Sequence, residues 1–335
     1  MKKLNELTNN EKDNILVDVV ASLTKKFKGS RILANNEIES DIKVFIDTGL
    51  VTLNSVLGKG LPSGKVIEIY GKESSGKTTL VQHLIAQANS QGYLAVYVDG
   101  EFSLEKNRAK QLKMDFNKIL YYTPETLEEA FNFIDDTIEL LNEKNPNKPV
   151  LICLDSLAAF PSEADLKGEI GELKVGGSAR INAQAMRVLT SKLARCSATL
   201  LIINQVRDNP GVMFGEKEST PGGRAVKFHS AIRLKISKKE VLKDADKVIG
   251  ILSEISVTKN KIAPPFGKCM IPIYFNRDEN CIDNEESVFN YLEEKELLEK
   301  EGKSYKFKDL KFTRNAFPEV YKENKDIFDT AILEY

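Results

Sequence analysis

One short segment has the residue types and the spacing of a phosphate-binding loop. Residues 71–78 read Gly-Lys-Glu-Ser-Ser-Gly-Lys-Thr and lie between a predicted strand, Lys65–Tyr70, and a predicted helix, Thr78–Ser90. Glycines let backbone N–H groups turn toward phosphate oxygens, and the helix N-terminus adds positive potential. We expect Lys77 to reach the β- and γ-phosphates and Thr78 to ligate Mg²⁺. The residues expected to contact the nucleotide are Gly71, Lys72, Glu73, Ser74, Ser75, Gly76, Lys77, Thr78 and Thr79.

Three polar residues stand where other predicted strands end, so a parallel sheet would bring them beside this loop. Asp155 is expected to hold Mg²⁺ through water, with capping of the next helix as the alternative. Glu101 is placed to polarise an attacking water as a general base, or else is a solvated loop residue. Gln205 is expected to hydrogen-bond a γ-phosphate and move the loop that it opens, unless its amide only completes a turn.

Strand and helix patterns alternate through the middle of the chain. Apolar strands that alternate with helices are typical of a parallel sheet covered on both faces. The predicted strands are Lys65–Tyr70, Tyr93–Asp99, Ile119–Tyr122, Pro149–Asp155 and Ala198–Asn204. The predicted helices are Thr78–Ser90, Leu104–Leu112, a helix capped by Thr123 that runs to Lys144, and Ala179–Arg195.

The remaining segments add to both ends of this core. Three strand-like runs, 231–237, 253–259 and 269–275, are expected to extend the sheet at one edge, and a small α/β domain is expected to follow. Two loops, 161–178 and 206–223, are long for a compact domain, which favours a functional role.

The N-terminal segment has the pattern of an amphipathic helix. Thr8 and Glu11 have capping-box spacing, and an apolar stripe follows at helical intervals. The stripe docks either on another subunit or on the protein's own core.

Composition excludes several classes of protein. The 335 residues carry a net charge of −1, so nucleic-acid binding must come from local patches. Four scattered cysteines suggest neither zinc nor disulfides, and no apolar run is long enough for a membrane span. The polar N-terminus predicts a cytoplasmic protein.

Many short blocks together resemble the bacterial RecA recombinase family over nearly the whole chain. They include residues 26–30, 61–64, 71–79, 155–159, 168–171, 179–180, 184–187, 204–207, 211–215, 222–223 and 259–264. The resemblance implies a RecA-like P-loop NTPase core of α/β class with a mostly parallel central sheet. It also implies an N-terminal helical arm (1–35), a core (36–275) with two DNA-binding loops, and a small C-terminal α/β domain (276–335).

The same resemblance implies roles for individual residues. Glu101 becomes the water-activating glutamate and Gln205 the nucleotide sensor, while Lys259 and Lys261 reach the ATP of a neighbouring subunit. Phe214 and Phe228 resemble inter-subunit contacts, with a core role as the alternative. The implied DNA-contacting residues are Val175, Arg180, Arg187, Arg207, Gly222, Gly223 and Arg224.

The implied function is that of an ATP- and Mg²⁺-dependent recombinase. It forms a homo-oligomeric helical filament on single-stranded DNA, exchanges strands with double-stranded DNA, and promotes self-cleavage of a LexA-like repressor. A ring-forming helicase or repair ATPase is a second reading, and a regulatory assembly that uses ATP only as a structural ligand is a third.

The chain also departs from the family pattern. Arg108 stands where the family stacks a tyrosine on adenine, and a planar guanidinium can stack there instead. Residues 208–210 read Asp-Asn-Pro in place of a more basic, apolar run. Near the C-terminus, basic residues alternate with aromatics, which indicates either a duplex-DNA gateway or a solvated basic face. These basic residues are Lys303, Lys306, Lys308, Lys311 and Arg314.

Overall fold

The computed structural model divides the chain into two units, Met1–Asp41 and Ile42–Tyr335. The residues that it describes are 18, 19, 22, 23, 25, 26, 42, 44–145, 147–169, 177–208, 218–278 and 281–335. In the first unit the six described residues are helical and fall within the predicted amphipathic segment. The capping box at Thr8 lies outside the described residues.

The second unit is built on an eight-stranded sheet in the order β12-β11-β10-β3-β7-β6-β4-β5. Strands β10 to β5 in this order are parallel, whereas β11 runs antiparallel to both of its neighbours, β10 and β12. The mostly parallel sheet and its extension at one edge are therefore confirmed. The strands are β3 (Val66–Gly71), β4 (Leu94–Asp99), β5 (Ile119–Tyr122), β6 (Val150–Asp155), β7 (Ala198–Gln205), β10 (Ile232–Asp244), β11 (Lys247–Asn260) and β12 (Lys268–Tyr274).

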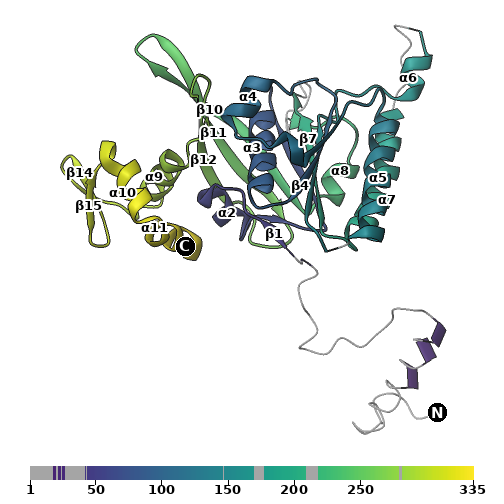
Figure 1. Cartoon of the computed structure of the whole chain (residues 1–335), viewed down its shortest axis with the longest axis horizontal. Helices are drawn as coiled ribbons and strands as arrows, with labels where there is room; N and C mark the ends of the chain where they lie inside the picture. The colour runs from purple at the N-terminus through teal and green to yellow at the C-terminus, as the bar shows by residue number, and fades with distance from the viewer. Residues whose placement is uncertain are drawn as a thin grey trace. The chain divides into compact units, whose positions relative to one another are not determined.

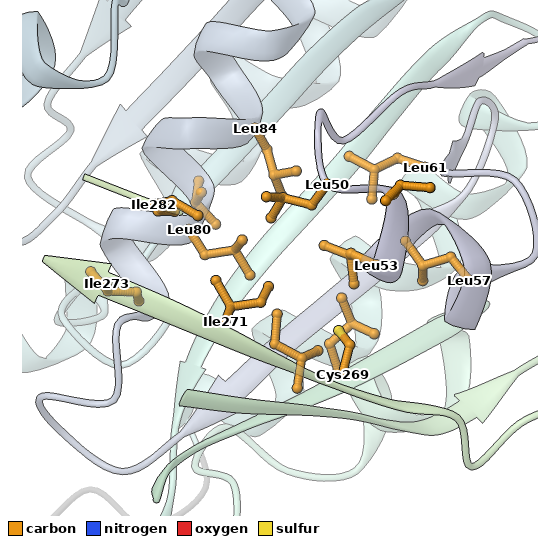
Figure 2. Close-up of a cluster of buried hydrophobic side chains, with 14 of the residues drawn as sticks. Leu50, Leu53, Leu57, Leu61, Leu80, Leu84, Cys269, Ile271, Ile273 and Ile282 are labelled. Carbon is orange, nitrogen blue, oxygen red and sulfur yellow. The ribbon is translucent and has the colours of Figure 1, made fainter. Parts of the chain in front are cut away.

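Helices cover both faces of this sheet (Figure 1). Because strand side chains alternate between faces, Val66 packs on one side with helices α5 and α7, while Ile67 packs on the other with α2 and α3. Figure 2 shows part of the second cluster, where Leu50 and Leu53 meet Leu80 and Ile271. The helices are α2 (Val51–Leu57), α3 (Lys77–Ser90), α4 (Lys106–Gln111), α5 (Leu127–Lys144), α6 (Glu163–Lys167), α7 (Gly177–Leu193) and α8 (Ala225–His229).

Some boundaries differ from the expectation. Helix α5 begins at Leu127 rather than after Thr123, because Thr126 is its N-cap and accepts a hydrogen bond from the Glu129 N–H. Helix α6 lies within the expected first loop, where Ser162 and Asp165 form a capping box. Strands β10 and β11 are also longer than predicted. Beyond Ile236, β10 pairs only with β11, and the tip of this hairpin projects from the sheet (Figure 1).

The C-terminal elements pack around an aromatic cluster. Phe307 stacks on Phe328 with ring centroids 4.7 Å apart, and Phe312 is buried beside them, as the alternating pattern predicts. Ser287 donates to the Met270 carbonyl of β12 at 2.7 Å, which joins these elements to the sheet. The elements are α9 (Asn284–Glu294), β13 (Glu299–Glu301), β14 (Ser304–Phe307), β15 (Leu310–Thr313), α10 (Phe317–Glu323) and α11 (Lys325–Glu334).

Short elements complete the fold, and the cysteines have no metal or disulfide role in the described part. Two short strands pair beside α2, β1 (Phe45–Ile46) and β2 (Leu61–Pro62). All four cysteines are buried and unbridged, and the described residues hold no cluster of three or more metal-ligating side chains. None of the described helices has the length and apolar character needed to cross a membrane.

One buried histidine predicts how stability depends on pH. His83 on α3 donates from Nε2 to the Thr48 carbonyl at 3.0 Å, and burial lowers its pKa to about 4. Protonation of His83 is therefore less favourable in the folded state than in the unfolded chain. The free energy of unfolding decreases as the pH falls from 6.5, the ordinary pKa of histidine, through about 4, its pKa in the folded state. Over this pH range, the free energy of unfolding measured with urea should fall by roughly 3 kcal/mol more for the wild type than for His83→Gln. Equal acid destabilisation of the two proteins would contradict this account.

Candidate nucleotide site and adjoining loops

The phosphate-binding loop joins β3 to α3 in a conformation that requires its two glycines. A Cβ on Gly71 would lie 2.2 Å from the Ile236 carbonyl oxygen, and a Cβ on Gly76 would lie 2.4 Å from Ile273 Cδ1. Gly76 also has φ +92°, which disfavours other residues. It caps α3 without a side-chain hydrogen bond, so no cap side chain competes for the helix N-terminus. The loop is thus shaped to bind an anion.

Two hydroxyl groups hold the loop from inside. Ser75 Oγ donates to the Lys72 carbonyl at 2.8 Å. Ser253 on β11 donates from Oγ to the Ser75 carbonyl at 2.9 Å, and this contact is buried. The antiparallel edge of the sheet therefore supports the phosphate-binding loop directly.

Lys77 lies at the first position of α3 with its ammonium group inside the loop. Its Nζ donates to the Lys72 carbonyl at 2.8 Å. Burial lowers the pKa of Lys77, and the charges of Glu101, Asp155 and Glu73 oppose this shift. A phosphate would supply the full countercharge that this buried ammonium lacks.

Asp155, at the end of β6, has the features of a cation-binding carboxylate. Its Oδ2 accepts a hydrogen bond from the Tyr97 hydroxyl at 3.0 Å, whereas its Oδ1 is buried and has no hydrogen-bond partner. Burial raises the pKa of Asp155 to about 6, and a hydrogen bond from Thr78 opposes this rise. Ser162 caps the next helix, so Asp155 does not cap it. The unsatisfied oxygen of Asp155, in the same cavity as Thr78, fits Mg²⁺, a hard ion that keeps water and phosphate ligands as well.

Glu101 and Gln205 meet above the loop. Gln205 Nε2 donates to Glu101 Oε1 at 3.3 Å, and Ser156 Oγ donates to the same oxygen. The two side chains come from different strand ends, β4 and β7, as the parallel order requires. Glu101 is an exposed loop residue, but these hydrogen bonds tie it to the ends of β6 and β7, and the Gln205 amide contacts Glu101 rather than only its own turn.

These groups share one cavity of about 360 Å³. It is lined by Glu73, Ser74, Ser75, Gly76, Lys77, Thr78, Thr79, Glu101, Asp155, Ile203 and Gln205. A larger hollow of about 550 Å³ lies against α5 and α6, but its acidic lining disfavours a triphosphate. The cavity at the phosphate-binding loop is the nucleotide site that fits the chemistry.

The other predicted nucleotide residues lie outside this cavity. Arg108 on α4 donates from Nη1 to the Tyr274 carbonyl at 3.4 Å, one residue beyond the Ile273 side chain that abuts Gly76. Lys259 at the end of β11 donates to the carbonyls of Lys227 and Phe228, at 2.8 and 2.9 Å. Neither Lys259 nor Lys261 lines the cavity of its own chain.

The described C-terminal ends of the two long loops lie side by side. Asn182 of α7 donates from Nδ2 to the Gly222 carbonyl at 2.8 Å, and a Cβ on Gly222 would lie 2.3 Å from the same nitrogen. Gly223 packs against Ala179, where a Cβ would come within 2.9 Å. Both glycines have φ above +80°. The end of the second loop is thus fixed to the helix that begins where the first loop ends.

The arginines predicted to contact DNA are exposed around these loops. The four are Arg180, Arg187, Arg207 and Arg224. The second loop begins as a short ladder in which β8 (Arg207–Asp208) pairs with β9 (Glu218–Ser219). The loop predictions for Val175 and Phe214, and the departure at residues 209–210, lie outside the described residues.

Sequence reasoning missed several residues that shape the site. Ser156, which bonds Glu101, follows Asp155 directly, and its position next to a strand-end carboxylate was a usable signal. Tyr97 and Ser253 act across the sheet, and no local pattern identifies them.

Comparisons with known proteins agree with this site. The profile of the family described as RecA N-terminal domain matches residues 14–279. "Protein RecA" of Malacoplasma penetrans (strain HF-2) is 35% identical over 313 residues, which cover 92% of each chain. "Protein RecA" of Clostridium novyi (strain NT) is 34% identical, covering 95% of this chain and 89% of the relative. "Protein RecA" of Bacteroides thetaiotaomicron is 34% identical, covering 96% of each.

Proposed function

Because the chain belongs to the bacterial RecA family of DNA recombinases, we propose that it is a DNA-dependent ATPase whose nucleotide state controls its grip on single-stranded DNA. The observation that carries this proposal is the hydrogen bond between Gln205 and Glu101. Glu101 lines the nucleotide cavity, and Gln205 is the last residue of β7, where the second loop begins. A contact at that point can pass a change in the cavity to the loop.

The proposed cofactors are ATP and Mg²⁺. Lys77 and the loop backbone would hold the phosphates, while Thr78 and Asp155 would hold the ion, Asp155 through water. Bound Mg²⁺ neutralises charge on the phosphate oxygens. On ATP binding, Gln205 would exchange its bond to Glu101 for one to the γ-phosphate, and Glu101 would then orient and deprotonate the attacking water.

The proposed assembly is a helical homo-oligomer with ATP at the interface between subunits. Lys259 and Lys261 lie outside their own cavity, which supports a role at the ATP of a neighbour. Phe228 is 63% exposed, which favours the inter-subunit contact over a core role. Arg108 would stack on the adenine base, since its guanidinium bonds the Tyr274 carbonyl, next to the Ile273 side chain that abuts Gly76.

The proposed DNA surface consists of the two loops and the exposed arginines beside them. Guanidinium groups and backbone N–H groups at Gly222 and Gly223 suit phosphate oxygens. Val175 is included in this surface by the family resemblance.

A basic C-terminal face contributes less to this proposal. Three of its cations are paired with acidic side chains: Lys306 with Glu299, Lys311 with Glu301, and Arg314 with Glu286. Such pairing favours the solvated-face interpretation over a duplex gateway. We therefore place DNA binding at the loops within residues 36–275.

Family membership also supports two wider proposals. The filament would promote self-cleavage of a LexA-like repressor, and it would pair single-stranded with double-stranded DNA in the cytoplasm. The decisive experiment is a strand-exchange assay with ATP, ADP and a slowly hydrolysed analogue. ATP and the analogue should support joint molecules and ADP should not, and exchange without any nucleotide would contradict the proposal.

Gln205 should be needed for the switch but not for nucleotide binding. In Gln205→Ala the amide that contacts Glu101 is gone, so the γ-phosphate can no longer draw the second loop into place. We expect ATP to bind normally, while its enhancement of single-stranded DNA affinity falls by about tenfold or more. Fluorescence anisotropy with labelled oligonucleotide measures this loss. Undiminished enhancement would remove Gln205 from the mechanism.

A further inference from the structure

A buried ion pair lies in the sheet between the nucleotide cavity and the second loop. Glu68, in the middle of β3, accepts a hydrogen bond from Arg233 Nε of β10 at 2.5 Å. Their side chains are 0% and 8% exposed. The Arg233 guanidinium also lies 4.3 Å from the centre of the Tyr70 ring. A buried pair of this kind is weak evidence for stability, so its other contacts matter.

The second oxygen of Glu68 connects the pair to the loop. Glu68 Oε1 accepts from Asn204 Nδ2 at 3.2 Å, and the same nitrogen donates to the Pro221 carbonyl at 3.4 Å. Pro221 directly precedes Gly222, where the second loop is fixed to α7. One amide group therefore joins the ion pair to the returning arm of the loop.

Asn204 also contacts the proposed nucleotide sensor. Its Oδ1 accepts from the Gln205 N–H at 3.0 Å, and the Gln205 side chain bonds Glu101. A shift of Gln205 toward a phosphate must move this N–H, and hence the Asn204 amide. The Asn204 carboxamide thus has partners on both sides, the nucleotide cavity and the loop.

The ion pair is also connected to β11, the strand on the other side of β10. Tyr70, which Arg233 covers, donates from its hydroxyl to Thr258 Oγ1 at 3.0 Å, and Thr258 donates to the Arg233 carbonyl at 3.2 Å. Thr258 precedes Lys259, the residue proposed to reach a neighbour's ATP. Hydrogen bonds therefore connect the ion pair to Gln205 at the nucleotide cavity and to Thr258, next to the residue proposed to contact the next subunit.

We propose that Glu68 and Arg233 are positioning residues that fix the Asn204 carboxamide and so couple nucleotide occupancy to the second loop. Neither touches the cavity, so neither takes part in the chemistry of hydrolysis. This inference rests on the proposed function, because it assumes that ATP increases the affinity for single-stranded DNA. A pair of neutral amide side chains, isosteric at residue 68 and shorter at residue 233, should keep the fold while it weakens the hold on Asn204.

The test compares single-stranded DNA affinity with a slowly hydrolysed ATP analogue and with ADP. Replacing both residues, Glu68→Gln with Arg233→Gln, avoids leaving one charge buried alone. We expect the ATPase activity without DNA to stay within about twofold of wild type. The ratio of single-stranded DNA affinity with the analogue to that with ADP should fall from about tenfold or more to about one. A ratio that stays at the wild-type value in the folded double variant would overturn the inference.

A control and a second variant keep the outcomes separate. Lys192→Gln breaks the ion pair with Asp135 between α7 and α5, and it should leave the ratio unchanged. If the double variant does not fold, Asn204→Ser replaces it, because this change breaks the link and leaves the ion pair intact. Loss of the ratio supports the inference, and a wild-type ratio overturns it. If the wild-type protein binds single-stranded DNA equally well with the analogue and with ADP, this result would instead contradict the proposed function.

Discussion

Lys77→Ala is expected to abolish ATP hydrolysis and joint-molecule formation. The Lys77 ammonium lies inside the phosphate-binding loop and donates a hydrogen bond to the Lys72 carbonyl. Alanine removes a cation that no other described residue of the cavity lining supplies, so phosphate binding and charge stabilisation are lost together. We expect hydrolysis to fall by about 10²-fold or more, the effect of removing one preorganised charge partner. A phosphate-release assay with single-stranded DNA measures it.

The control for Lys77→Ala is a neighbouring lysine. Lys72 contributes its carbonyl to the loop rather than a charged group to the cavity lining. Lys72→Ala should therefore keep most of the activity. Strand exchange by Lys77→Ala at the wild-type rate would contradict the assigned mechanism.

Glu101→Ala is expected to separate binding from turnover. The Glu101 carboxylate lies at the mouth of the cavity and accepts hydrogen bonds from Ser156 and Gln205. Without it, water is no longer activated, and hydrolysis should fall by about 10²- to 10⁴-fold. The phosphate ligands remain, so ATP should still promote DNA binding and the complex should persist because ATP is not consumed.

Two measurements check Glu101→Ala together. Phosphate release by Glu101→Ala should be lost. The anisotropy of labelled single-stranded DNA with Glu101→Ala and ATP should match that with the wild type and a slowly hydrolysed analogue. Glu105→Ala is the matched control, since this glutamate follows on the same segment but lies outside the cavity lining. If Glu101→Ala hydrolyses ATP normally, another group is the general base.

Much of the fold could be predicted because its signals are local. Strand β6, for example, is a continuous apolar run that ends in Asp155, so its position and the approach of Asp155 to the loop follow from the chain itself. The phosphate-binding loop is also a contiguous pattern. The structure brings Lys77 and Thr78 of this pattern together in one cavity.

What could not be predicted depends on contacts between distant segments. Ser253 reaches Ser75 from a strand 178 residues later, and no spacing rule connects them. Glu68 and Arg233 are charged residues inside strands, and the pairing of β3 with β10, which sets them opposite each other, explains why both can be buried. The start of α5 was misplaced because Pro124 after Thr123 imitates a cap, whereas the Thr126 hydroxyl makes the capping bond.

The central claim is that the contents of the cavity around Lys77 determine how tightly the two loops hold DNA. Equilibrium binding of labelled single-stranded DNA, measured with no nucleotide, with ADP and with a slowly hydrolysed ATP analogue, tests it most directly. The account predicts about tenfold or tighter binding with the analogue than in either other state. Equal affinity in all three states would contradict it.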